Sequence, residues 1–264
     1  MPNISAHPLY EGTFSVGTDH TFNRIKRDDS PAKGALKLSI NPFLIKEDER
    51  KILFDAGIGD LIGNDTSIET ILENLEEQSV SDYEITDIFI SHLHFDHMGG
   101  LAHQSNGYWE LTFPDANLWV SEKGWKKLNE NLENVTEKEK DFVNFIDTWA
   151  EIRFISDDSE PIENLRVKKI GGHTEFHQSL FYVNGKNKYL MAGDVIGRRI
   201  SINRSFAAKY DFNPKQSMKA REMLKQMALK DGYTIMAYHE TDYPLFKLVE
   251  YNDQAGYTVE KISV

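Results

Sequence analysis

Short apolar runs separated by turn residues recur along the chain, a pattern typical of β-strands. Runs at 36–44 and 51–55 flank a charged Lys-Glu-Asp-Glu-Arg segment and predict a hairpin. The runs 180–183 and 188–192 predict a second hairpin, because the Asn-Gly between them tolerates the positive φ angles of tight turns. Further strands are predicted at 85–90, 118–120, 166–170, 233–238 and 257–262.

Apolar residues three and four positions apart predict three amphipathic helices. The first apolar stripe covers 68–75 and the second 142–149, each behind a Thr-x-x-Glu capping box that starts at Thr66 or Thr136. An Asn-Pro pair predicts the start of a third helix, with its stripe at 220–228. Strands that alternate with one-sided helices predict sheets covered by helices, and the hairpins disfavour a purely parallel sheet.

Composition then removes several functional classes. The 264 residues are 40% hydrophobic and hold no repeat or linker, which predicts one domain over residues 1–264. A formal net charge of −12 argues against nucleic acid and anionic membrane partners. The absence of Cys excludes disulfides, a cysteine nucleophile and thiolate metal ligands. With no secretory signal and no apolar run of roughly 18 residues, we expect a cytoplasmic protein.

The strongest chemical signal is Ser-His-Leu-His-Phe-Asp-His at 91–97, which follows directly on a predicted strand. Alternate side chains of an extended segment point the same way, so His92 and His94 can converge on one point. Where the chain turns, Asp96 and His97 can face a neighbouring point. Imidazole and carboxylate together suit zinc, and also iron or manganese, so the segment predicts a metal site.

Three more candidate ligands stand where later predicted strands end. His173, Asp194 and His239 each follow such a strand, the usual place for functional groups in sheet-based folds. Each alone is typical of a turn or of a hydrogen-bonded structural residue. Their occurrence together, in order behind the first cluster, indicates a joint site.

These motifs resemble those of the metallo-β-lactamase superfamily. The resemblance is carried by Ser-His-Leu-His-Phe-Asp-His, Gly-Gly-His-Thr-Glu-Phe-His-Gln-Ser, Ala-Gly-Asp and Ala-Tyr-His-Glu, and by Leu-Phe-Asp-Ala-Gly at 53–57. It spans about residues 36–240. It implies an α/β fold, a four-layer αββα sandwich in which two mixed sheets face each other, with helices on the outer faces and metals at one rim.

The family pattern implies two metal sites bridged by one carboxylate. It also implies Asp55 as a carboxylate that orients a ligand imidazole, and His177 as a residue that supports the site. We expect two divalent ions, zinc before iron or manganese. The implied ligands are His92, His94 and His173 for the first ion, Asp96, His97 and His239 for the second, and Asp194 for both.

The implied activity is hydrolysis, in which a bridging hydroxide attacks the carbonyl of a small ester or lactone while Asp96 or Asp194 relays a proton. The sequence looks most like the N-acyl-homoserine lactonase-like branch. It departs from that branch at Gly197, where those lactonases tend to place a Tyr that polarises the carbonyl. Three other tyrosines are candidates to replace it: Tyr210, Tyr238 and Tyr243.

The segment after Asp194 is predicted to be either a substrate wall or a solvated connector. Its aromatic residues Phe206, Tyr210 and Phe212 are expected at a pocket, and its basic residues are expected to attract an anionic substrate. The stretch 12–33 is predicted as a polar loop that covers the site or a neighbouring subunit. The basic residues of the segment after Asp194 are Arg198, Arg199, Arg204 and Lys209.

Other activities stay open from the sequence. Hydrolytic alternatives are a glyoxalase-II-like thioesterase and a small phosphodiesterase, and a mononuclear iron dioxygenase represents a different class. A metal site without catalysis is a further reading. The expected partner is a small-molecule substrate, with no nucleic acid or membrane, and a homodimer is compatible with the sequence.

Overall fold

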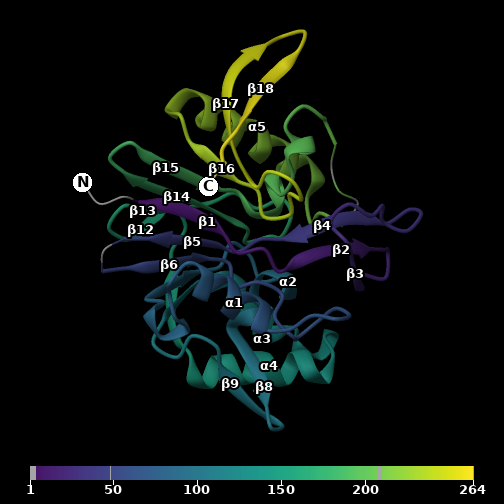
Figure 1. Ribbon diagram of the computed structural model, residues 1–264, viewed down its shortest axis with the longest axis vertical. Coiled ribbons are helices and arrows are strands. Elements are labelled where there is room, and N and C mark those ends of the chain that lie inside the picture. Colours follow the sequence, from purple (N-terminus) through teal and green to yellow (C-terminus); the bar gives the residue numbers. More distant parts are fainter. Residues whose placement is uncertain (1–3, 48, 207, 209, 264) are drawn as a thin grey trace.

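The computed structural model describes residues 4–47, 49–206, 208 and 210–263, so Asp48 of the predicted hairpin turn and the basic Lys209 lie outside the described residues. Two large sheets form the centre (Figure 1). The six-stranded sheet has the order β1 (Ser5–Pro8), β5 (Phe43–Lys46), β6 (Lys51–Phe54), β7 (Asp87–Phe89), β10 (Asn117–Ser121), β11 (Glu151–Ile155).

The second large sheet has seven strands, and two small sheets complete the set. The seven-stranded sheet has the order β12 (Ser159–Ile162), β13 (Leu165–Lys169), β14 (Gln178–Asn184), β15 (Asn187–Met191), β16 (Thr234–Met236), β17 (Leu245–Asn252), β18 (Gly256–Lys261). The small sheets are β3 (Phe22–Ile25), β2 (Gly12–Val16), β4 (Leu36–Ile40), and the pair β8 (Ala102–Ser105), β9 (Tyr108–Leu111).

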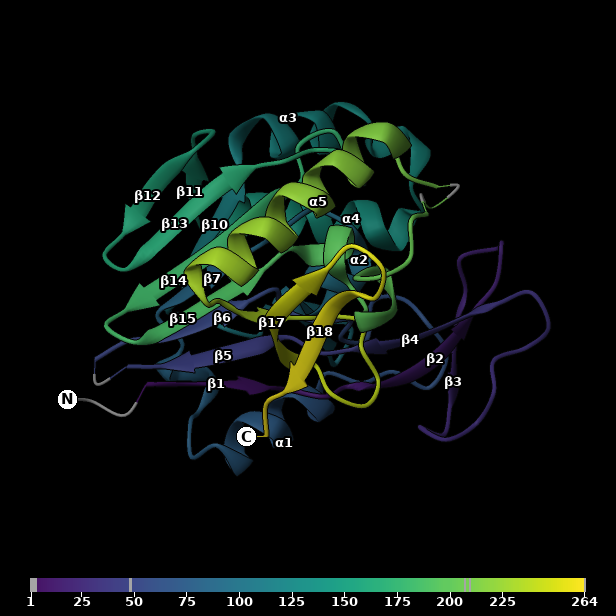
Figure 2. The same ribbon diagram turned by 90° about the horizontal axis from the view of Figure 1, so that it is seen from above.

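Both large sheets are mixed. The pairs β6–β7, β7–β10 and β10–β11 are parallel in one sheet, and β15–β16 in the other, while their remaining pairs are antiparallel. The longer helices lie on the outer faces, with α5 over the seven-stranded sheet and the others over the six-stranded sheet (Figures 1 and 2). The helices are α1 (Glu69–Glu77), α2 (Phe95–Met98), α3 (Glu122–Glu130), α4 (Glu137–Trp149) and α5 (Pro214–Asp231).

Alternation along the strands explains the layers. In β5, Phe43 and Ile45 belong to the core between the two sheets, whereas Leu44 belongs to the core under α1 and α4. In β14, Leu180 faces the other sheet and Phe181 packs in the core with α5. Strands with both faces covered are apolar throughout, because each successive side chain enters a different core. The predicted αββα sandwich is confirmed.

Three local predictions are wrong. The run 36–44 is two strands, because the chain breaks after Ile40 and passes from the β2–β4 sheet into the six-stranded sheet. The predicted polar loop at 12–33 contains β2 and β3, which extend sideways from the sandwich (Figure 2). The first helix begins at Glu69 without a side-chain cap bond, so the Thr66 box is not formed, whereas the Thr136 box is.

The connections place several loops along one rim. Asp55 follows β6, the segment 91–97 follows β7, Asp194 follows β15, and His239 stands just beyond β16. Because β6 and β7 are parallel, as are β15 and β16, their carboxyl ends meet at that rim. Among the described residues, no helix is long and apolar enough to cross a membrane.

Candidate metal centre

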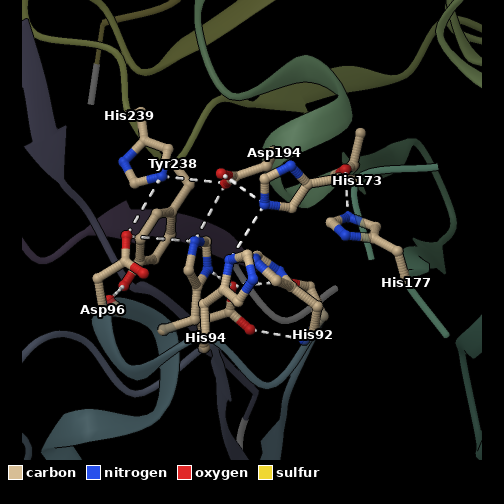
Figure 3. Close-up of polar contacts among 12 residues, drawn as sticks. His92, His94, Asp96, His173, His177, Asp194, Tyr238 and His239 are labelled. Atoms are coloured by element: carbon tan, nitrogen blue, oxygen red, sulfur yellow. Dashed lines mark hydrogen bonds and ion pairs between the residues drawn. The ribbon is translucent and has the colours of Figure 1, made fainter. Parts of the chain in front are cut away.

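Three imidazoles from two loops form the first triad. His92 Nε2 lies 3.0 Å from His94 Nδ1, and His173 Nε2 lies 3.1 Å from the same His94 atom (Figure 3). The His92 and His173 side chains are buried, while His94 is exposed. The three donor atoms lie within 4.8 Å of one another, so they could hold one metal ion.

A second triad, Asp96, His97 and His239, lies beside the first. Asp96 Oδ2 is 3.7 Å from His97 Nε2 and 3.5 Å from His239 Nε2. The rings of His92 and His97 have centroids 4.1 Å apart, so the two triads are neighbours. These three residues also form a group that could hold a metal ion.

Asp194 reaches both triads with different oxygens. Its Oδ1 lies 3.1 Å from His97 Nε2 and 3.0 Å from His239 Nε2. Its Oδ2 lies 3.3 Å from His173 Nε2 (Figure 3). The carboxylate thus spans the two triads, as a bridging ligand must.

The spacing of these atoms fits metal coordination. Two atoms that each lie about 2.1 Å from a tetrahedral metal are about 3.4 Å apart, in the range of the separations above. His97 Nε2 and Asp194 Oδ1 are buried and make no hydrogen bond with the described residues. Buried polar atoms are normally satisfied, so atoms that converge without a hydrogen bond indicate a missing partner, and a cation would satisfy both.

The charges around His97 indicate the same partner. Burial lowers the pKa of its imidazole, but Asp96, Asp55 and Asp194 outweigh burial and raise it well above the ordinary value. Burial also opposes the charge on Asp194, whose pKa is nevertheless held well below its usual range by His239, His173 and His97. Three carboxylates around one buried imidazole favour positive charge there, which a dication on the Nε2 side would supply.

The other nitrogen of each buried ligand imidazole has a partner of its own. Asp55 Oδ2 lies 2.6 Å from His97 Nδ1, and the backbone carbonyl of Ser39 lies 3.0 Å from His239 Nδ1. Asp211 Oδ1 lies 2.9 Å from His173 Nδ1, and Ser91 Oγ lies 3.1 Å from His92 Nδ1. Such contacts fix the orientation and tautomer of a ligating His.

The backbone of Asp55 itself is strained. Its φ is +57°, in the left-handed region that non-glycine residues rarely adopt. Its two oxygens accept hydrogen bonds from Ser91 N at 2.6 Å and Ser91 Oγ at 2.8 Å. The Asp55 carboxylate therefore connects the end of β6 to the motif that follows β7.

Two buried rings pack against the ligand imidazoles. His177 stacks on His92 with centroids 4.5 Å apart, and its Nε2 donates to the Ala192 carbonyl at 3.0 Å. Burial lowers the pKa of His177 to about 3, so its ring is neutral. Tyr238 stacks on His97 at 4.0 Å and donates its phenolic proton to the Asp96 carbonyl oxygen at 2.7 Å.

A cavity of about 370 Å³ opens beside the first triad. His94 and His173 contribute to its wall, and Tyr210 stands at the boundary, its ring centroid 5.7 Å from that of His173. Apolar side chains form much of the remaining lining: Leu93, Phe176 and Phe212.

The predicted substrate wall is only partly at this cavity. Tyr210 and Phe212 line it, but Phe206 does not, because its ring packs against Arg221 at 4.8 Å. Of the predicted basic residues that the structure describes, none lines it; the cavity's cation is Lys127, which pairs with Glu175. The predicted polar stretch does reach the site boundary, since His20 contacts the Tyr210 ring.

Of the partners that orient the candidate ligands, the sequence predicted Asp55, which lies against His97, but not the other three. Asp211 lies in the Tyr-Asp-Phe-Asn-Pro segment, in which only the aromatic residues were predicted to have a role. Ser39 acts through its backbone carbonyl, which carries no sequence signal. Ser91, directly before the first His, is the one whose position offered a clue.

Comparison with known proteins gives one family. The model of the metallo-beta-lactamase superfamily matches residues 36–239. No curated protein matches the chain.

Solved structures share the fold over nearly the whole chain. AidC, described as a dizinc quorum-quenching lactonase in complex with a product, has a TM-score of 0.78 at 19% identity, with 99% of this chain and 95% of that chain covered. A probable metal-dependent hydrolase from Staphylococcus aureus has a TM-score of 0.76 at 21% identity and 99% coverage of both. The hydrolase AbOPH gives 0.75 at 20%, covering 99% and 95%.

Proposed function

This chain belongs to the metallo-β-lactamase superfamily, and we propose that it is a metal-dependent hydrolase that opens a small ester or lactone. The observation that carries the proposal is the position of Asp194, whose two oxygens face two adjacent ligand triads. We propose His92, His94 and His173 for one divalent ion, Asp96, His97 and His239 for the other, and zinc as the metal. Bound there, such ions would supply an activated water at neutral pH and polarise a carbonyl.

The chain's acids would handle the protons. Asp96 and Asp194 are the acidic side chains that face the convergence point of the triads, and both lie within 4 Å of imidazole nitrogens. Either can take a proton from the attacking water and pass it to the departing oxygen. Asp55 keeps His97 oriented from the opposite side of the ring, so its role is positioning.

Tyr210 is the tyrosine best placed to polarise the substrate carbonyl. Tyr238 is buried and already donates to the Asp96 carbonyl, and Tyr243 lies under Lys261 with the ammonium 3.6 Å from its ring centroid. Tyr210 lines the cavity, and burial together with Asp194 raises its pKa to about 12. It therefore stays protonated at neutral pH and can donate a hydrogen bond to a developing oxyanion.

The cavity favours a neutral substrate with an apolar substituent. Its volume of about 370 Å³ and its Leu93, Phe176 and Phe212 wall suit a small organic molecule. A glutathione thioester would need free cations to bind its carboxylates, and Lys127 is already paired with Glu175. This favours the ester or lactone reading over the thioesterase reading.

The test is a hydrolysis panel on protein of measured metal content. We expect two zinc ions per chain and turnover of lactones and aryl esters well above that of S-lactoylglutathione or bis-aryl phosphates. Asp194→Ala should lower metal content and reduce turnover by at least about 100-fold. A matched control is Asp157→Ala, which removes an exposed acid paired with Lys123 and should leave turnover unchanged.

Two results would overturn the proposal. Full turnover in Asp194→Ala would remove the bridging role. One iron per chain with oxygen consumption, and no ester or lactone hydrolysis, would assign the site to oxidation instead.

A further inference from the structure

A second cavity, of about 290 Å³, lies between α5, the segment 202–205 and the β17–β18 hairpin, which we call the α5 cavity. In Figure 1 these elements lie on the seven-stranded side of the sandwich. The α5 cavity shares no lining residue with the cavity beside the first triad. It is therefore a separate candidate site.

Cations predominate in its lining, in a chain whose net charge is −12. Arg204, Arg221 and Lys225 line it together with one acid, Glu222. Glu222 is taken up by Lys225, whose Nζ lies 2.7 Å away, and by the hydroxyl of Tyr257 at 3.0 Å. Among the described residues, the other two cations of the lining, Arg204 and Arg221, have no acidic partner.

Arg221 is the unusual member of this group. Only 6% of it is exposed, and among the described residues no carboxylate oxygen lies within 4.0 Å of its guanidinium. Its Nε donates to the Val195 carbonyl and its Nη1 to the Phe206 carbonyl, both at 2.7 Å. A guanidinium has five N–H donors, so these two bonds leave donors that make no hydrogen bond with the described residues.

A buried cation without a counter-ion is costly, and a guanidinium pairs especially well with the oxygens of a phosphate or carboxylate. Asp211, whose charge acts on Arg221, accepts hydrogen bonds from His173 and from Ala208 N. It is therefore not free to complete the pair. The β17–β18 hairpin contributes the rings of Tyr251 and Tyr257 to the lining, with centroids 4.7 Å apart.

We propose that the α5 cavity binds the oxyanion group of a small aromatic phosphate or carboxylate. Arg221 and Arg204 contact the oxyanion, and Tyr251 and Tyr257 contact the ring. The site is independent of the proposed hydrolysis. Its occupant would touch the guanidinium that holds Val195, the residue after Asp194.

The test is calorimetric titration of the zinc-loaded protein at low salt with phenylphosphonate, which cannot be hydrolysed as an ester, and with benzoate. Phenol serves as the uncharged control. We expect saturable binding of at least one anion, which identifies the preferred group, and none of phenol. Arg204→Gln should weaken it roughly tenfold, since it removes a charge-assisted hydrogen bond. Lys219→Gln, on the exposed face of the same helix and outside the lining, should leave it unchanged.

Anions also bind metals, so the two sites must be separated. One outcome is that the anion inhibits hydrolysis competitively and that Arg204→Gln binds the anion as tightly as wild type does. The anion then binds only at the metal centre, and the proposal fails. Equal weakening by Lys219→Gln would reduce the effect to general charge and also overturn it. A conservative second variant, Arg221→Lys, should weaken binding while the protein keeps its zinc.

Discussion

Glu11 lies beside the loop that follows Asp55, and its pKa provides a quantitative test of the cost of burying a carboxyl group there. It is 1% exposed, and its Oε2 accepts hydrogen bonds from Ile58 N at 2.9 Å and Gly59 N at 3.4 Å. Its Oε1 has no hydrogen-bond partner among the described residues. Burial outweighs these two bonds and nearby Arg24, and raises the pKa of Glu11 from 4.5 to about 8.

The sign of the pH effect follows from that direction. Between pH 4.5 and about 8 the native state binds a proton at Glu11 that the unfolded state has lost, so stability falls as pH rises. The slope is about 1.4 kcal/mol per pH unit. From pH 5.5 to 7.5, wild type should therefore lose about 2 to 3 kcal/mol of unfolding free energy relative to Glu11→Gln, which cannot titrate at this position.

The assay is urea unfolding of both zinc-loaded proteins at several pH values between 5.5 and 7.5. Effects of pH on the ligand histidines are common to both proteins and cancel in the difference. Glu11→Met is the matched control: neither Met nor Gln titrates, so the unfolding free energies of the two variants should differ by the same amount at every pH. A wild-type-minus-Gln difference that stays constant with pH would refute a protonated Glu11.

Four further outcomes concern the candidate centre. Tyr210→Phe should lower kcat by about 10- to 100-fold with little change in KM, measured by steady-state kinetics; an equal kcat would remove Tyr210 as the oxyanion donor. Asp211→Asn should weaken zinc binding about 10- to 100-fold in a chelator competition, because His173 loses its carboxylate partner. His173→Asn should cost more zinc by metal analysis than His177→Asn; the reverse order would exchange their roles. Removal of zinc should lower the unfolding free energy by about 4 kcal/mol relative to protein at a thousandfold excess of zinc over Kd, and an unchanged Tm would contradict this.

The sequence was most informative where the chemistry is local. The four candidate ligands of the first motif lie within six residues behind one strand, and the alternate spacing of His92 and His94 alone indicated that these two side chains converge. The Asn-Pro start of α5 is equally local, and Asn213 accepts the Gln216 backbone hydrogen bond at 3.1 Å as an N-cap should. The hairpin β14–β15 depended on the turn chemistry of four adjacent residues.

Contacts between distant segments could not be read in the same way. Ser39 and His239 are separated by 200 residues, and their contact uses a backbone oxygen. The strand β3 exposes Asn23 and Arg24, and β2 is polar in sequence although all of its residues are buried. Phe14 of β2 and Phe22 of β3 nevertheless meet with ring centroids 5.8 Å apart. Glu11 carries no signal of burial in its own neighbourhood, because residues 58 and 59 supply its partners.

Gly197 stands where the lactonases that the sequence resembles tend to place a tyrosine, and its surroundings bear on which residue can line the pocket instead. Its carbonyl accepts the His239 backbone N–H at 2.8 Å, and a Cβ at this position would lie 3.2 Å from His239 Cδ2. That spacing is tighter than ordinary van der Waals contact, so a side chain at 197 would press on a candidate ligand. The backbone here closes directly on His239, and a phenol at the boundary must come from another segment. Tyr210 lines the cavity from the loop whose next residue, Asp211, contacts His173, so one short segment would supply both the proposed donor for the substrate and the partner of a candidate ligand.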